Sequence, residues 1–357
     1  MKKLLSAILF VAVIAAVIWI GRGPISLWIM DRTMAPGMTA DVVRDLPDGL
    51  HAFVCGSGSP FPDPDRAGPC LAVVAGKRVF LVDAGEGAAE TLSRGQFPAA
   101  RIEGVLLTHF HSDHVDGLGA VALQRWVGAS AKTPMMLTGP VGVDRIATGL
   151  NEFYALDNSY RTAHHGAAVA PPEGAGFAHR TIVFPEGQSQ VVILDEGGLK
   201  ITAFKVDHSP VENAVGYRFD YRGRSLVVTG DTAANPNVVT AARGADLLIH
   251  DALAPNLVAR MQAASTEAGM PARAKIMADI PDYHASPEDA ARQAKAAGVK
   301  ALLLTHIVPP LPLKGLEGPF LGDARKLFGG ELWIARDRDL ISLPAGGSDI
   351  RRRRTGR

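Results

Sequence analysis

Cysteine is almost absent from this chain, which has only Cys55 and Cys70 among its 357 residues. So few cysteines exclude a small fold held together by several disulfides, and they exclude a zinc finger built from thiolates. We expect both cysteines to be free thiols, although whether they pair stays open if the domain is exported to an oxidising compartment.

Net charge is also nearly absent, at +1 for the whole chain, so no strong electrostatic footprint for nucleic acid is expected. Two segments depart from this balance. Residues 139–199 contain no lysine and carry three arginines against seven acidic residues, which gives this segment a net charge of −4. Residues 345–357 end in a run of arginines and are predicted to be a basic, disordered and solvated tail.

One long apolar run is present, and it lies at the N-terminus. Lys2 and Lys3 precede residues 4–20, which are apolar except for Ser6. A helix of this length would rise about 25 Å, against a hydrocarbon core of about 30 Å. The run ends in bulky residues and lacks a small-residue cleavage site, so residues 1–21 are predicted to be an uncleaved signal anchor, with a cleaved signal peptide as the alternative. The two lysines should stay in the cytoplasm, which places the rest of the chain in the periplasm or on the cell surface.

Residues 22–45 are predicted to be a linker, and residues 46–344 to be one layered α/β domain, because short apolar strands alternate with helices through both halves. A helix over residues 287–297 is predicted to begin after Ser286, whose side chain can cap it. Residues 139–199 are richer in glycine, proline and polar residues and are predicted to be an insertion or cap. The predicted strands cover residues 51–55, 70–75, 79–82, 104–107, 199–206, 214–221, 225–229, 247–249 and 301–304.

Histidine is concentrated in one short stretch. His109, His111 and His114 fall within six residues directly after a predicted strand, together with Asp113 and Asp116. Two histidines two residues apart can converge on one cation, and the adjacent Asp113 and His114 can face a second. Further candidate ligands follow later strands, whose carboxyl ends share one rim of an α/β sheet. These later candidates are His208, Asp231 and His306.

The stretch from His109 to His114 resembles the HxHxDH motif of the metallo-β-lactamase fold superfamily, and the later ligand motifs follow in the expected order. This resemblance covers about residues 46–343 and implies an αββα sandwich with two zinc ions at one edge; manganese or iron could also use these ligands. It implies that Asp83 supports the metal ligands from behind. The implied ligands are His109, His111 and His208 for the first ion, Asp113, His114 and His306 for the second, and Asp231 for both.

Finer motifs resemble the ribonuclease Z-like and arylsulfatase-like branch. In that branch an acidic residue and a histidine act on the scissile bond, and the matching residues here are Asp251 and His284. Asp251 replaces the usual glutamate and is one methylene shorter. We expect His284, oriented by Asp251, to act as general acid near the leaving oxygen, with Asp113 also counted among the catalytic residues. Substrate-binding candidates are Ser57 in the first glycine turn, and Tyr160 and Arg161 in a predicted polar lid.

The resemblance therefore predicts a dinuclear zinc hydrolase that uses a metal-bridging hydroxide, most simply on a small phosphodiester or aryl sulfate ester. Expected partners are this small anionic ester and, through the first helix, the membrane; no nucleic acid is expected, and a homodimer stays open. Alternatives are a lactone or β-lactam hydrolase, a ribonuclease Z-type tRNA 3′ endonuclease, and a non-catalytic metal-binding envelope protein. Short ribonuclease Z carries a basic arm where this chain has the segment of net charge −4, which disfavours tRNA.

Overall fold

The computed structural model describes residues 2–356 and forms two compact units that meet between Val42 and Val43. The first unit contains one helix, α1 (Lys2–Met38). Its 32-residue stretch Lys3–Met34 is the one segment within residues 2–356 that is long and apolar enough to cross a membrane. The helix continues past the expected end at residue 21 and takes in most of the expected linker, because the apolar sequence resumes after Pro24.

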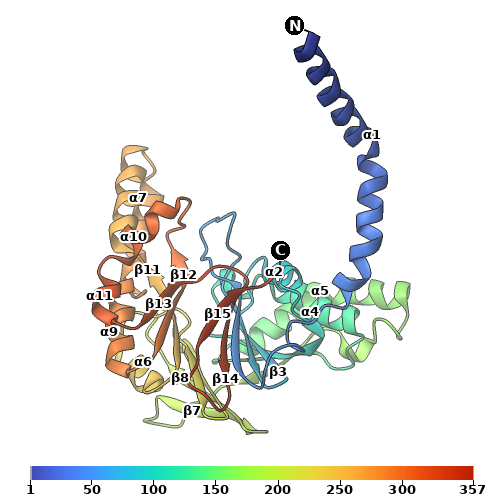
Figure 1. Ribbon diagram of the computed structural model, residues 1–357. Helices are drawn as coiled ribbons and strands as arrows, with labels where there is room; N and C mark the ends of the chain where they lie inside the picture. The colour runs from blue at the N-terminus through green and yellow to red at the C-terminus, as the bar shows by residue number, and fades with distance from the viewer. Residues whose placement is uncertain (1, 357) are drawn as a thin grey trace. The chain divides into compact units, whose positions relative to one another are not determined.

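The second unit is a sandwich of two mixed sheets with helices on both outer faces, as the sequence predicts (Figure 1). The eight-stranded sheet has the order β15 (Arg351–Arg354), β14 (Asp339–Pro344), β1 (Gly49–Gly56), β2 (Cys70–Ala75), β3 (Arg78–Val82), β4 (Ile102–Leu106), β5 (Met135–Gly139) and β6 (Phe177–Thr181). The seven-stranded sheet has the order β13 (Glu331–Ile334), β12 (Ala301–Val308), β11 (Leu247–Leu253), β10 (Arg224–Val228), β9 (Val215–Tyr221), β8 (Leu199–Lys205) and β7 (Gln190–Glu196).

Helices cover both sheets. On the first half of the chain they are α2 (Ala88–Arg94), α3 (Ser112–Val115), α4 (Leu118–Ala129) and α5 (Val143–His165). On the second half they are α6 (Pro236–Ala242), α7 (Pro255–Glu267), α8 (Pro271–Asp279), α9 (Pro287–Ala297), α10 (Glu317–Leu321) and α11 (Ala324–Phe328). Short 3-10 turns occupy Ala99–Arg101, Pro172–Gly174, Ile280–Asp282 and Lys314–Leu316. Helix α9 begins as predicted, because Ser286 and Asp289 form a capping box at its first turn.

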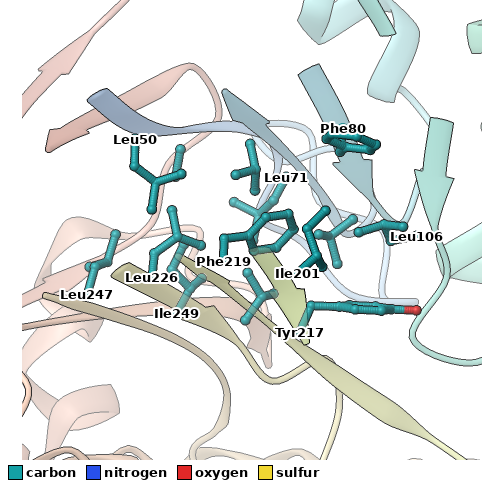
Figure 2. Packing of buried hydrophobic residues seen from close by; sticks show 14 of the residues in the cluster. Leu50, Leu71, Phe80, Leu106, Ile201, Tyr217, Phe219, Leu226, Leu247 and Ile249 are labelled. Carbon is teal, nitrogen blue, oxygen red and sulfur yellow. The ribbon is translucent and has the colours of Figure 1, made fainter. Parts of the chain in front are cut away.

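The core lies between the sheets, and side chains alternate along each strand to reach it (Figure 2). In β1, Leu50 and Ala52 face the seven-stranded sheet, whereas Phe53 points to the other side and stacks on Phe97 with ring centroids 5.1 Å apart. Every position of β1 is buried, because helices cover the outer face while the second sheet covers the inner one. Tyr217 is buried in this core and donates a 2.6 Å hydrogen bond from its hydroxyl to the carbonyl oxygen of Leu107.

Residues 139–199, predicted to be an insertion or cap, belong to the sandwich itself. They contribute helix α5, edge strand β6 beside β5, and edge strand β7 beside β8. The prediction missed this because edge strands bury only part of their side chains and are therefore less apolar than central strands.

The predicted disordered tail is also wrong for residues 351–354. These four arginines form strand β15, which pairs antiparallel with β14 from Asp339↔Arg354 to Ser342↔Arg351. Thr355, directly after the strand, is buried and its amide donates to the carbonyl oxygen of Arg338 over 2.9 Å. Charge alone suggested disorder, but backbone hydrogen bonds to β14 and salt bridges hold the segment in place. Arg351 pairs with Asp349 and Arg352 with Asp339.

Cys55 and Cys70 form a disulfide, so the expectation of free thiols is wrong. Strands β1 and β2 pair antiparallel, and the register shifts between Val54 and Gly56, which brings the two Cα atoms within 4.9 Å. The bond closes the glycine turn that follows β1. The sequence alone could not reveal this contact, because the pairing register and its bulge bring the two cysteines together.

Replacing both cysteines with serine is expected to lower the free energy of unfolding by about 3 kcal/mol, because the bond restricts a loop of 15 residues in the unfolded chain. Urea unfolding of the two proteins with and without reductant measures this difference. Reductant should destabilise the parent chain by a similar amount and leave the double variant unchanged. Equal stability of the oxidised parent and the variant would contradict the expectation.

Candidate metal centre and active site

The candidate site lies at one rim of the sandwich, where several strands end. Most of the residues that could act there follow or terminate a strand, so the backbone of the sheets fixes their position. Asp83 follows β3, His109 follows β4, Asp231 follows β10, and Asp251 and His306 lie near the ends of β11 and β12. His208 lies between β8 and β9, and His284 precedes α9.

His306 reaches the rim through a bulge. Asp251 pairs with Thr305 and Ala252 with Ile307, so His306 is the extra residue between two paired positions of β12. Its backbone has a φ of 48°, in the left-handed region that few histidines adopt. Bulges re-aim side chains at functional sites, and this one turns the imidazole toward Asp231, whose Oδ2 lies 3.1 Å from Nε2 of His306.

The first group of potential ligands contains three imidazoles. Nδ1 of His111 lies 3.0 Å from Nε2 of His109 and 3.3 Å from Nε2 of His208. Oδ2 of Asp231 lies 3.9 Å from the same atom of His109 and 4.0 Å from that of His208. Four ligand atoms this close together could hold one metal ion.

The second group contains Asp113, His114 and His306. Oδ2 of Asp113 lies 3.3 Å from Nε2 of His306 and 3.6 Å from Nε2 of His114. Oδ2 of Asp231 lies 3.2 Å from Nε2 of His114, so this carboxylate stands between the two groups. The arrangement is consistent with a dinuclear metal site.

A cation would satisfy atoms that the protein leaves without a partner. Nε2 of His114 and Oδ1 of Asp231 are buried and make no hydrogen bond within the described residues. Buried polar atoms rarely lack a partner, so an unpaired nitrogen beside an unpaired carboxylate oxygen fits a metal ion between them. The nitrogen and oxygen donors of the two groups suit zinc, and they would also accept manganese or iron.

Hydrogen bonds behind the imidazoles fix which ring nitrogen faces the centre. Asp83 accepts from Nδ1 of His114 over 2.8 Å and from the hydroxyl of Thr108 over 2.8 Å. That hydroxyl can then accept from Nδ1 of His109, 3.0 Å away. Both histidines consequently present the lone pair of Nε2 to the site, as metal ligands require.

His208 is oriented in the same way by the backbone. Its Nδ1 donates to the carbonyl oxygen of Tyr283 over 3.0 Å, which again leaves Nε2 facing the site. No sequence signal points to this contact, because a carbonyl oxygen is present at every residue. The supporting role of Thr108 could have been predicted, since a hydroxyl directly before His109 can form a hydrogen bond within the loop that carries the potential metal ligands.

Burial and neighbouring charge shift the pKa values in opposite directions. Burial and the adjacent imidazoles hold the pKa of His109 well below its usual value. Burial would raise the pKa of Asp231, but His306 and His114 outweigh burial and lower it strongly. Burial would lower the pKa of His114 and His306, but the charge of Asp231 outweighs burial and raises both, so a bound metal ion would displace protons from these two rings.

A cavity of about 250 Å³ opens beside the two groups. His111, Asp113, Asp231 and His306 line it together with His284, and apolar side chains complete the wall. A pocket with few charged groups among apolar ones suits a small reacting centre held in a defined orientation. The apolar residues are Phe61, Ile280, Tyr283 and Val308.

His284 and Asp251 are in contact, as the sequence predicts for a catalytic pair. Nδ1 of His284 donates to Oδ2 of Asp251 over 2.9 Å, so the shorter aspartate still reaches the imidazole. A third residue, His250, was not predicted. Its Nδ1 lies 2.9 Å from the carbonyl oxygen and 2.9 Å from Oδ1 of Asp251.

His250 faces hydrogen-bond acceptors at both ring nitrogens. The amide nitrogen of Gln293 donates to Asn235, so its Oε1, 3.0 Å from Nε2 of His250, is an acceptor. The ring therefore carries protons on both nitrogens and forms a buried ion pair with Asp251. Burial alone would lower the pKa of His250, but its bond to Asp251 raises it above the usual value.

This ion pair makes a pH-dependent contribution to stability. A group whose pKa is raised by folding stabilises fully below its unfolded pKa of about 6.5, and the contribution is lost as pH rises through the folded pKa. His250→Gln should therefore cost more free energy of unfolding at about pH 6 than at about pH 9. Urea unfolding of both proteins at the two pH values tests this, and a cost that grows with pH would show that His250 is neutral in the folded chain.

The predicted substrate-binding residues do not reach this cavity. Ser57 is fully buried, and its amide and hydroxyl both donate to Oδ1 of Asp337, over 3.0 and 2.8 Å. Tyr160 and Arg161 lie on α5, where Arg161 pairs with Asp157 over 2.7 Å and lines a separate cavity of about 270 Å³ beside α4. The predicted lid is a regular helix, and neither Tyr160 nor Arg161 lines the cavity beside the potential metal ligands.

Known proteins resemble this chain in sequence and in fold. The beta-lactamase superfamily domain model matches residues 78–307. The ribonuclease Z proteins of Mycolicibacterium paratuberculosis and Mycobacterium marinum are 35% and 34% identical over 298 residues, which is 83% of this chain and 99% of each relative. The chain therefore belongs to the metallo-β-lactamase superfamily. Within that superfamily it is ribonuclease Z-like, as the motifs predict.

Solved structures agree on the fold. The metallo-β-lactamase fold protein YhfI from Bacillus subtilis matches with a TM-score of 0.59 and 21% identity, over 83% of this chain and 100% of its own. The short form of human tRNase Z matches with a TM-score of 0.58 and 24% identity, over 82% and 99%. The αββα sandwich predicted from the sequence is thus confirmed.

Proposed function

We propose that this chain is a dinuclear metal-dependent phosphodiesterase that cleaves RNA. The observation that carries the proposal is the Asp251–His284 pair, 2.9 Å apart, whose imidazole lines the same cavity as the potential metal ligands. Identity of 35% to ribonuclease Z over nearly the whole length of that relative supports RNA as the substrate class, in place of the small ester that the sequence first suggested.

Each residue of the rim has a role in this proposal. His109, His111 and His208 would hold one ion, Asp113, His114 and His306 the other, and Asp231 would contact both; zinc suits these donors. When bound, the two ions would lower the pKa of water and stabilise charge on the phosphate oxygens. Asp83 orients His114, so its loss should weaken metal binding without removing a ligand.

His284 would move the proton. Its Nδ1 is committed to Asp251, which leaves Nε2 for the cavity. When Nε2 carries a proton it can donate it to the oxygen that leaves the phosphorus atom, and the bond to Asp251 holds the ring in that orientation. Tyr283 and Phe61 line the same cavity. Asp113 would act here as a ligand beside His306, whose Nε2 lies 3.3 Å from its Oδ2.

The proposal is tested by measuring the hydrolysis of several substrates by the full-length chain, purified in detergent. The panel contains precursor tRNA, an unstructured RNA oligonucleotide, bis(p-nitrophenyl) phosphate and p-nitrophenyl sulfate. RNA should give the highest kcat/KM. Cleavage of a small ester without any cleavage of RNA would overturn the RNA assignment. It would favour the second candidate substrate, a small phosphodiester or aryl sulfate. The net charge of −4 over residues 139–199 supports that candidate.

We also propose that α1 anchors the domain to the membrane with the active site on the extracytoplasmic side. The apolar stretch Lys3–Met34 supports the anchor, and the disulfide between Cys55 and Cys70 supports an oxidising compartment. Full-length protein should resist carbonate extraction from membranes, whereas a chain beginning at Val43 should be soluble and equally active. Mature protein that lacks the first residues and is recovered in the soluble fraction would identify a cleaved signal peptide.

A further inference from the structure

A second, larger cavity adjoins the metal-site cavity. Its volume is about 790 Å³, and the two cavities share Pro60, Phe61, Ser112 and Asp113 in their walls. A chain whose reacting bond lies at the metal ligands could therefore continue directly into the larger space. The catalytic roles described above use none of the arginines that line it.

Three of these arginines come from different parts of the chain. Arg94 ends α2, Arg338 lies between β13 and β14, and Arg354 ends β15. Backbone bonds fix their positions, since the amide of Arg338 donates to the carbonyl oxygen of Val54 over 2.7 Å. Nε of Arg354 donates to the carbonyl oxygen of Asp337 over 3.1 Å, which holds the end of β15 at the cavity. We call this set, Arg94, Arg338 and Arg354, the arginine rim.

Acidic residues also line this cavity, and some of them already interact with other protein groups. Asp63 pairs with Arg66 over 3.2 Å, and both side chains are nearly buried. The carboxylate of Asp337 accepts from Ser57 and from the amide of Ala67. The remaining acidic residues lie on loops or short helices. They are Asp65, Glu86, Glu90, Asp113 and Asp116. The walls of the cavity therefore carry both signs of charge, and the arginine rim comes from the last turn of α2, the β13–β14 turn and β15.

We propose that the arginine rim binds the phosphate backbone of an RNA strand whose scissile bond lies at the metal ligands. This inference rests on the proposed RNA cleavage. Guanidinium groups form paired hydrogen bonds with phosphate oxygens, and a basic groove that follows the backbone is how single strands are bound without sequence preference.

RNA fits this surface better than an anionic lipid headgroup does. Arg354 lines a concave space that continues to Asp113, whereas a bilayer contacts the outer surface of a protein. The basic segment at the end of the chain, first interpreted as a tail, thus gains a fixed position beside the reaction. It supplies the positive charge that the segment of net charge −4 lacks.

Arg354→Ala is the main test, with Arg351→Ala as the matched control. Arg351 is on the same strand, is exposed, pairs with Asp349 and does not line the cavity. For an unstructured RNA oligonucleotide, Arg354→Ala should raise KM roughly tenfold with little change in kcat, and should reduce the slope of log affinity against log salt by about one. Hydrolysis of bis(p-nitrophenyl) phosphate should not change, because this substrate does not extend to the rim.

Binding measurements separate this inference from the proposed function. Fluorescence anisotropy of a labelled RNA strand, with metal chelated, reports binding by each full-length variant without cleavage. Weaker RNA binding by Arg354→Ala and by Arg94→Ala, but not by Arg351→Ala, supports the arginine rim. This holds even if the parent chain cleaves no RNA, because that result would refute only the proposed function. Efficient cleavage by the parent with unchanged KM and salt slope in both variants would refute the arginine rim alone.

Two further controls complete the design. Arg354→Lys should restore part of the salt dependence, since it restores charge without the guanidinium fork. Sedimentation with vesicles containing anionic lipid tests the other polyanion. Equal loss of vesicle binding in Arg351→Ala and Arg354→Ala, with unchanged RNA binding, would assign β15 to the membrane surface and overturn the inference.

Discussion

Asp231→Ala is expected to remove at least one of two metal ions and to lower kcat/KM by about a thousandfold or more, because several kcal/mol of charge stabilisation depend on the ions. Oδ2 of Asp231 lies 3.2 Å from Nε2 of His114, 3.1 Å from Nε2 of His306 and 3.9 Å from Nε2 of His109. No other side chain within residues 2–356 joins the two groups of potential ligands in the same way.

Elemental analysis of protein purified without chelator measures this loss, and the parent chain should contain two divalent ions per chain. Asp220→Ala is a suitable control, because Asp220 pairs with Arg218 on β9 and is not among the potential metal ligands. One ion or none in the parent chain would contradict the dinuclear assignment. A variant that retains both ions would show that Asp231 is not shared between them.

His284→Ala is expected to keep both metal ions and to lower kcat on RNA by about 10²- to 10⁴-fold, the usual contribution of a general acid. The loss should be much smaller on bis(p-nitrophenyl) phosphate, because nitrophenolate leaves without needing a proton. Asp251→Asn should fall between the parent and His284→Ala, since it weakens the orientation of the imidazole but leaves the imidazole in place.

Metal content and leaving-group dependence distinguish three roles for His284. Equal losses on both substrates would indicate that it positions the phosphate instead of donating a proton. Loss of a metal ion would make His284 a ligand, which is geometrically open because it can join Asp231 and His306 around one point. Only retained metal with a leaving-group effect fits the proposed acid.

Much of the fold could be predicted because its signals are local. Apolar strands, the capping residue Ser286 and the cluster from His109 to His114 each depend on neighbours in the sequence. The order of the ligand motifs along the chain indicated how the strands are arranged in the whole domain. The candidate metal ligands lie on segments that follow predicted strands, so their gathering at one rim could be predicted, while their binding of metal stays a prediction.

The parts that could not be predicted depend on contacts between distant segments. The disulfide needs the bulged register of β1 and β2, and β15 needs β14 as a partner. Arg161 illustrates the opposite error, because its residue type suits an anionic substrate while its place on α5 directs it to Asp157. Residue type indicates chemistry, but only tertiary structure shows which cavity a side chain reaches.

Strand β15 also determines how copies of this protein can meet. It is the terminal strand of the eight-stranded sheet, and an uncovered strand edge is a template on which another chain can add. Four consecutive arginines protect this edge, because a second copy would bring an identical row of positive charge against it. The β15 edge therefore disfavours edge-to-edge pairing with a second copy, which is the growth that leads from sandwich proteins to fibrils.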